Sequence, residues 1–368
     1  MSKTKAELGF DINDILMATK YAALSITDDK EGTLQKVVQT GGPWHVKNLA
    51  LITGSEEEAF KPLTYLLDRY MGLKIDCFMD KTCVTPGLDF VDLQGYIAHN
   101  DETIVVAYRC TSSNFDWIAN FSGTSSEWEL EEDLAQGYAG MCSGLEGLLC
   151  LCLGSKPRVH TGFYSNLLAS IPYLKEHVEP LLGKDQPPRK LYICGHSLGA
   201  GIATLAGIYF LLEHDWSKLA QKLVLVTLGG PRACQKGMQE LVDKEVKRLR
   251  AEGHADKVSL YRVVKDQDIV ATLPPTILGY RHLDDYVFIN NDGVIKLVGK
   301  GEERNTEDSE VKSMTRSIPK ITAEDTDNEK SEDEKQKEYQ AKVQGLPKMF
   351  RDHILEFYMK PMMKLASS

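Results

Sequence analysis

The feature that most constrains this chain is the pentapeptide Gly-His-Ser-Leu-Gly at residues 195–199. It follows an apolar, strand-like run at residues 191–194 and opens a helix-like stretch rich in small residues. A nucleophilic serine on a sharp strand-to-helix turn needs this context, because side chains at Gly195 and Gly199 would collide with neighbouring backbone. Free amides at the start of the helix can also stabilise an oxyanion. We therefore predict that Ser197 is the nucleophile of a hydrolase.

Apolar runs alternating with helical patterns predict the architecture. Strand-like runs lie at residues 95–98, 104–108, 191–194, 223–228 and 260–264, and helical patterns at 11–25, 58–71, 163–182 and 198–213. Short apolar runs separated by helices favour buried parallel strands with crossover helices. We predict an α/β-hydrolase fold, with a mostly parallel central sheet, helices on both faces and a lid insertion, in a single domain over residues 1–368.

The net charge and the hydropathy of the chain argue against a nucleic-acid-binding protein and against a membrane-spanning one. The net charge is −10 and no dense run of lysine and arginine is present, which argues against a nucleic-acid partner. No apolar leader follows the first residues, and the longest weakly polar stretch, residues 198–212, is too short to span a bilayer. We expect a cytoplasmic protein with no transmembrane segment.

The cysteines predict neither a disulfide scaffold nor a metal site. Eight cysteines in 368 residues is a low density, and we expect mostly reduced thiols. The Cys-Leu-Cys at residues 150–152 has no second pair at ligand spacing nearby, so no zinc site is expected.

A serine nucleophile needs a base and an acid that orients the base, and in this fold the acid and then the histidine follow the serine along the chain. The acid should follow a strand, and Asp266 and Asp268 both follow the run at residues 260–264. Only His282 and His353 come after that run. His282 follows so closely that it would remain on the same side of the next strand. Spacing therefore favours His353 and leaves both acids open.

Several segments, taken together, resemble the class 3 lipases, the fungal-type lipase family with its diacylglycerol-lipase relatives. The resemblance covers roughly residues 90–358. The segments are Asp-Leu-Gln-Gly-Tyr at 92–96, the Arg-Cys-Thr strand at 105–113 with Asp-Trp-Ile at 116–118, Val-His-Thr-Gly-Phe at 159–163, the pentapeptide at 195–199, Leu-Gly-Gly-Pro-Arg at 228–232, Asp-Ile-Val-Ala-Thr-Leu-Pro-Pro at 268–275, and Asp-His at 352–353 with Tyr358.

The resemblance implies roles for individual residues. The family's acid precedes Ile-Val, which matches Asp268, and its base matches His353. The backbone N–H groups of its oxyanion hole map to Thr111 and Leu198. His282 matches a histidine that the family keeps near this strand without a role in the triad.

Two positions depart from the family pattern. Cys110 stands where the family has glycine, and Ala271 stands where it has proline after Asp-Ile-Val. If position 110 requires a positive φ, a Cβ there costs about 1 kcal/mol or more and would shift the oxyanion loop.

Two insertions accompany the predicted domain. Residues 119–158 occupy the place of a lid and include an apolar, glycine-flanked stretch at 144–153. This stretch could cover an acyl pocket and meet a lipid surface, or it could pack as an ordinary helix on the core. Residues 300–338 hold 13 acidic and eight basic residues and almost no large apolar ones, which favours disorder. We interpret this segment as a solvated loop or as a regulatory segment whose serines and threonines accept phosphates.

These patterns predict a lipase that hydrolyses carboxylic ester bonds of acylglycerols or related glycerolipids through a Ser-His-Asp triad and an acyl-enzyme. No cofactor is required. The expected substrate is an acylglycerol or a phospholipid, with a transient lipid-droplet or membrane surface as a candidate partner. Two alternatives remain: a non-catalytic lipase-like binding or signalling protein, and a feruloyl-type esterase of soluble esters. The long apolar lid candidate counts against the esterase.

Overall fold

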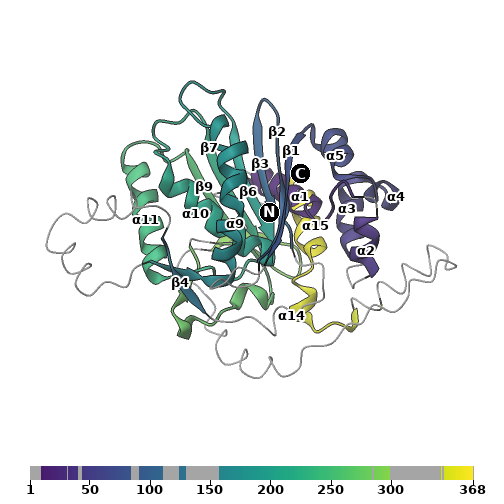
Figure 1. Cartoon of the computed structure of the whole chain (residues 1–368). Coiled ribbons are helices and arrows are strands. Elements are labelled where there is room, and N and C mark those ends of the chain that lie inside the picture. The colour runs from purple at the N-terminus through teal and green to yellow at the C-terminus, as the bar shows by residue number, and fades with distance from the viewer. Residues whose placement is uncertain are drawn as a thin grey trace.

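The protein has an α/β-hydrolase fold, as the sequence predicts, in which helices cover both faces of a mostly parallel sheet (Figure 1). The computed structural model describes residues 10–30, 32–39, 44–83, 91–110, 124–129, 157–283, 286–298, 341 and 344–367. The strand order of the central sheet is β1-β2-β3-β6-β7-β9-β11-β12. Its strands are β1 (Lys74–Cys83), β2 (Val91–His99), β3 (Thr103–Tyr108), β6 (Lys190–His196), β7 (Lys222–Leu228), β9 (Val258–Lys265), β11 (Tyr286–Ile289) and β12 (Ile295–Val298).

The five central strands β3, β6, β7, β9 and β11 are parallel, and the pairs at the two edges are antiparallel. All five predicted strand runs lie within observed strands. The strands β2 and β3 pair antiparallel, because only three residues join them and no crossover helix fits in so short a connection. Asn100 closes the hairpin, since its side-chain oxygen accepts hydrogen bonds from the backbone N–H groups of Glu102 (2.9 Å) and Thr103 (2.8 Å).

Helices form one layer on each face of the sheet. The helices α9, α10 and α11 lie on one side in Figure 1, and the N-terminal helices with α15 lie on the other. The helices are α1 (Ile12–Leu24), α2 (Thr33–Gln39), α3 (Trp44–Thr53), α4 (Glu56–Ala59), α5 (Leu63–Leu66), α9 (Thr161–His177), α10 (Leu198–Glu213), α11 (Lys236–Ala251), α14 (Lys348–Arg351) and α15 (Leu355–Ala366), with the π-helical turn η2 (Leu67–Met71) and the 3-10 turns η3 (Glu179–Leu181), η4 (Val270–Thr272) and η5 (Thr276–Leu278).

The parallel strands β3, β6 and β7 are buried on both faces, which explains their nearly continuous apolar sequences. In β6, Tyr192 and Cys194 join the apolar core beneath the N-terminal helices and α15, whereas Leu191 and Ile193 join the core beneath α9 and α10. The helix α10 carries apolar or small residues all round and is correspondingly buried. The strand β6 and the helix α10 are therefore fixed on every side, which holds the turn between them rigidly.

The helical pattern at residues 58–71 does not form one helix. It is divided into α4, α5 and η2, because Pro62 lacks an N–H group and disfavours helical backbone at the residue before it. The predicted helix at 163–182 likewise ends at His177, and the 3-10 turn η3 with Pro180 follows.

A second, four-stranded sheet has the order β10-β8-β5-β4, and its strands are β10 (Tyr280–Arg281), β8 (Cys234–Gln235), β5 (Arg158–His160) and β4 (Ser125–Glu127). The strand β4 belongs to the lid candidate, residues 119–158, of which only 124–129 and 157–158 are described. The acidic segment at 300–338 lies outside the described residues. No helix in the described part of the chain is both long and apolar enough to cross a membrane.

Candidate active site

Ser197 lies at the carboxyl edge of the central sheet, on the turn between β6 and α10. Its backbone has φ 58° and ψ −123°, a conformation that L residues rarely adopt. A Cβ on Gly195 would overlap the backbone of Gly199, and a Cβ on Gly199 would overlap the carbonyl oxygen of Tyr108. The two glycines are therefore required by close backbone approach, as their spacing in the sequence predicts.

One of the two predicted oxyanion groups, the backbone N–H of Leu198, lies directly after this turn. Leu198 is the first residue of α10, where backbone N–H groups have no partner within the helix. Thr111 lies outside the described residues, but the residues just before it contact the turn, because Tyr108 and Arg109 carbonyl oxygens face Gly199. The end of β3 therefore lies against the start of α10.

Cys110 does not adopt the backbone conformation that would make its side chain costly. Among the described non-glycine residues, only Ser197 and Asp266 have a positive φ. The Cys110 side chain is buried, and burial raises the pKa of its thiol to about 11. The thiol is therefore uncharged at neutral pH, and replacing the family's glycine strains no backbone at this position.

Asp268 and His353, the predicted acid and base, lie in direct contact. His353 Nδ1 is 2.9 Å from Oδ1 and 2.8 Å from Oδ2 of Asp268, and both side chains are buried. The Asp268 carboxylate also accepts hydrogen bonds from the backbone N–H of Val270 (2.9 Å) and from the hydroxyl of Tyr358. These contacts fix both the carboxylate and the ring that it faces.

Tyr358 belongs to a motif quoted from the sequence, but its contact with the acid was not predicted. Its hydroxyl donates to Asp268 and accepts a hydrogen bond from the backbone N–H of Lys265 (3.1 Å). Burial and the neighbouring Asp268 carboxylate raise the pKa of Tyr358 well above its usual value. The phenol is therefore a permanent donor to the acid.

The segment after β7 requires a glycine at position 229, because polar side chains approach its backbone closely. Gly229 has φ +54°, and a Cβ there would lie 2.5 Å from Asp268 Oδ2, 2.9 Å from the Tyr358 hydroxyl and 3.0 Å from His353 Nδ1. Only glycine leaves room for these three polar groups to meet. The Leu-Gly-Gly-Pro-Arg segment thus acts on the same cluster as the acid and the base.

Ion pairs hold the His353 segment against the end of β9. Lys348 forms ion pairs with Asp266 and with Asp352 (2.7 Å), and Asp352 accepts a hydrogen bond from the backbone N–H of Gln267 (3.2 Å). Asp266, the alternative acid in the sequence, is thus in contact with Lys348, whereas Asp268 contacts His353.

His196 links the serine turn to His353. Its ring stacks on the His353 ring with centroids 4.7 Å apart, and its Nε2 lies 2.8 Å from the main-chain oxygen of His353. Ser197 itself is held by a hydrogen bond from its backbone N–H to the Leu228 carbonyl oxygen (3.0 Å). The structure therefore brings Ser197, His353 and Asp268 to one edge of the sheet.

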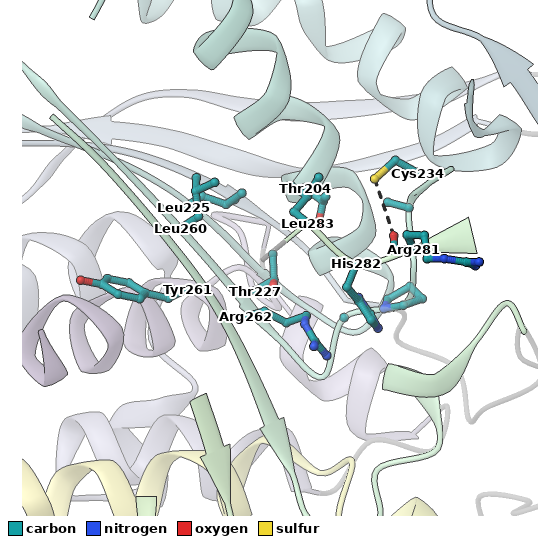
Figure 2. A pocket seen from close by; sticks show the side chains of 13 residues that line it. Thr204, Leu225, Thr227, Cys234, Leu260, Tyr261, Arg262, Arg281, His282 and Leu283 are labelled. Atoms are coloured by element: carbon teal, nitrogen blue, oxygen red, sulfur yellow. Dashed lines mark hydrogen bonds between the residues drawn. The ribbon is translucent and has the colours of Figure 1, made fainter. Parts of the chain in front are cut away.

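His282, the alternative base, is engaged elsewhere. Its Nε2 lies 2.8 Å from the Ala271 carbonyl oxygen, and burial, reinforced by Arg262 and Arg232, lowers its pKa well below the usual value. Figure 2 shows His282 beside Arg262 and Arg281 in a pocket of about 20 Å³. That volume suits about one water molecule, so this pocket is too small for an acyl substrate.

Metal ligands do not gather in the described part of the chain. No group of three or more His, Cys, Asp or Glu residues there could hold a metal ion. The four described cysteines, Cys77, Cys110, Cys194 and Cys234, are free thiols.

The fold and the serine turn define an α/β-hydrolase. Within this broad class, the sequence matches one family: the family model of the class 3 lipases aligns with residues 105–278. The match contains the serine turn and Asp268, and it confirms the resemblance seen in the sequence motifs.

Curated relatives and a solved structure agree with this match. Phospholipase A(1) DAD1, chloroplastic, of Arabidopsis thaliana is 25% identical over 50% of this chain and 36% of its own length. A secreted mono- and diacylglycerol lipase 2 of Gibberella zeae is 27% identical over 53% of this chain and 45% of its own. The matched part is thus less than two thirds of either relative. The triacylglyceride lipase of Rhizomucor miehei has the same fold, with a TM-score of 0.50, 20% identity, and coverage of 81% of this chain and 85% of that one.

Proposed function

We propose that this protein is a serine hydrolase that cleaves carboxylic ester bonds of acylglycerols or related glycerolipids. The observation that carries the proposal is the buried contact of His353 with Asp268, beside the strained turn that presents Ser197. The class 3 lipase match supports the reaction class, and the similarity to a phospholipase A(1) and to a mono- and diacylglycerol lipase supports a lipid ester as substrate.

The proposed reaction proceeds in two steps. The Ser197 oxygen attacks the acyl carbonyl carbon while His353 accepts the hydroxyl proton, and the backbone N–H groups of Leu198 and Thr111 stabilise the oxyanion. The carbon–oxygen bond to the alcohol then breaks, and His353 returns the proton to the leaving alkoxide. Water hydrolyses the acyl-enzyme by the same proton route, releasing the fatty acid and restoring Ser197.

Asp268 has the surroundings that its proposed role requires. It accepts hydrogen bonds from Val270 and Tyr358 in addition to its contact with His353, so its negative charge is stabilised without exposure to water. A fixed carboxylate holds the imidazole in the tautomer whose Nε2 carries no hydrogen and can accept a proton, and it stabilises the imidazolium that forms.

Contact with a lipid surface is part of the proposal, and a cytoplasmic location stays a prediction from the sequence. Two adjacent apolar side chains on η5 support the surface contact, since Ile277 is 76% and Leu278 is 48% exposed. The turn is held firmly, because Arg281 donates to the Thr276 carbonyl oxygen (2.9 Å) and Gln235 donates to that of Leu278 (3.3 Å).

Replacing both Ile277 and Leu278 by serine is expected to weaken binding to phosphatidylcholine vesicles by about tenfold. The reason is that the variant transfers less apolar surface from water into the lipid when it binds. Vesicle co-sedimentation measures the binding. Hydrolysis of a water-soluble short-chain ester should be unchanged. Phe60→Ser, which removes an apolar side chain that is 39% exposed at the end of α4, is the control. Equal loss of binding in both variants would contradict the prediction.

A series of p-nitrophenyl esters of increasing acyl length, with emulsified diacylglycerol and phospholipid, tests the function. We expect turnover that rises with acyl length and at lipid interfaces, and covalent labelling of Ser197 by an alkyl phosphonate, located by mass spectrometry. Turnover confined to short soluble esters would favour an esterase. Absence of both turnover and labelling would favour a non-catalytic, lipid-binding protein.

A further inference from the structure

His196 occupies a position that the proposed mechanism leaves unexplained. It is the residue before Ser197 and is 6% exposed, with its ring stacked on that of His353 at an interplanar angle of 27°. It is also the described side chain that joins the serine turn directly to the His353 segment, 157 residues further along the chain.

The protonation state of His196 follows from its partner. A main-chain carbonyl oxygen can only accept a hydrogen bond, so His196 Nε2 carries a hydrogen and donates it to His353. Burial, followed by the neighbouring His353 and His45, lowers the pKa of His196 well below its usual value. The ring is therefore neutral, and its Nδ1 bears a lone pair.

That lone pair has an energetic cost. His196 Nδ1 is buried and accepts no hydrogen bond from the described residues, and a buried acceptor without a donor costs about 1–3 kcal/mol. A phenylalanine would stack on His353 equally well without this cost. What histidine adds is the Nε2–H donor, which reaches the His353 carbonyl oxygen at 2.8 Å.

We propose that His196 is a positioning residue for the base, and that its Nε2–H and its ring together set where the His353 imidazole lies relative to Ser197. The inference rests on the proposed function of Ser197 and His353. The contact is suited to this task, because it runs from the nucleophile's own neighbour to the backbone of the base. Asp268 and Tyr358 fix the opposite, Nδ1 side of the His353 ring.

The neutrality of His196 matters for the same step. When His353 accepts the serine proton, a cation forms against the stacked ring, and a second positive charge there would oppose it. Among the described residues, His45, the other histidine that acts on His196, does not supply one. Burial, reinforced by Arg109, lowers the pKa of His45 to about 3, and the Tyr358 ring meets His196 edge-on at 6.1 Å.

A matched set of substitutions separates the donor from the ring. His196→Gln can place an amide N–H near the position of Nε2, whereas His196→Asn is one methylene shorter and cannot reach the carbonyl oxygen. His196→Phe keeps the stacked ring and removes the donor. For hydrolysis of p-nitrophenyl butyrate, we expect kcat to fall about tenfold to a hundredfold in the Asn and Phe variants with KM unchanged, because small misplacements of a reacting group cost that much. The Gln variant should recover most of kcat.

Two further measurements separate this role from a structural one and from failure of the proposed function. Thermal melting shows whether each variant is folded, and the downfield proton resonance of His353 Nδ1–H in the Asp268 contact reports the position of the base without any substrate. We expect this resonance to shift or broaden in the Asn and Phe variants and to persist in the Gln variant. An unchanged kcat in the Asn variant, or equal losses in the Gln and Asn variants, would overturn the inference. If the wild-type protein is inactive on every ester, a His353 resonance that stays the same in all variants would also overturn the inference. A resonance that changes in the Asn and Phe variants would support the inference and refute only the proposed hydrolase function.

Discussion

Ser197→Ala is expected to lower kcat for ester hydrolysis by about a millionfold, because the group that forms the acyl-enzyme is gone and only unassisted attack by water remains. Alanine keeps the Cβ at φ 58°, so the strain at the turn and the surrounding packing should be unchanged. The melting temperature and the binding to phosphatidylcholine vesicles should therefore equal those of the wild type. Turnover of p-nitrophenyl butyrate by freshly purified protein measures the effect.

Thr204→Ala is the matched control for this prediction. Thr204 lies two turns further along α10, and its hydroxyl donates to the Ala200 carbonyl oxygen (2.8 Å), so the change removes a hydroxyl from the same helix without touching the turn. Near-normal turnover is expected. More than a hundredth of wild-type turnover in Ser197→Ala would show that another residue is the nucleophile.

The serine turn could be predicted from the sequence because every requirement is local. A five-residue spacing, an apolar strand before it and small residues after it specify a turn in which Gly195 and Gly199 meet neighbouring backbone. The acid and the base could not be settled in the same way. Asp268 and His353 are 85 residues apart, and spacing alone left Asp266 equally suitable. Packing gives the two candidate acids different partners, because the chain turns between them: Asp266 contacts Lys348 and Asp268 contacts His353.

The contacts that support the site carry even weaker sequence signals. Tyr358 and His196 both lie in motifs of the sequence, but nothing in those motifs indicates their partners, which are a carboxylate 90 residues away and a main-chain oxygen 157 residues away. Edge strands were missed for a related reason: β1 alternates polar and apolar residues and belongs to no continuous apolar run. The family pattern suggested that Cys110 would strain the oxyanion loop if its φ were positive. The observed backbone shows that its φ is not positive.

Asp268→Asn is expected to lower kcat by about 10⁴-fold while leaving the fold intact, because asparagine nearly matches the size of the side chain but removes its charge. The amide cannot stabilise the imidazolium of His353, and its NH₂ group can face Nδ1 and impose the wrong tautomer. Tyr358 would lose its charged acceptor, so a small loss of stability is also expected. Steady-state turnover of p-nitrophenyl butyrate and thermal melting give the two measurements.

Asp266→Asn provides the comparison that identifies the acid. Both substitutions remove one carboxylate from the same short segment after β9, but Asp266 faces Lys348 and not His353. The Asp266 variant should lose part of an ion pair and little stability, with kcat close to that of the wild type, because Gln267 and Lys348 still bind Asp352 and hold the His353 segment. A larger loss of kcat in the Asp266 variant than in the Asp268 variant would reverse the assignment. Equal and small losses would mean that His353 works without a carboxylate partner.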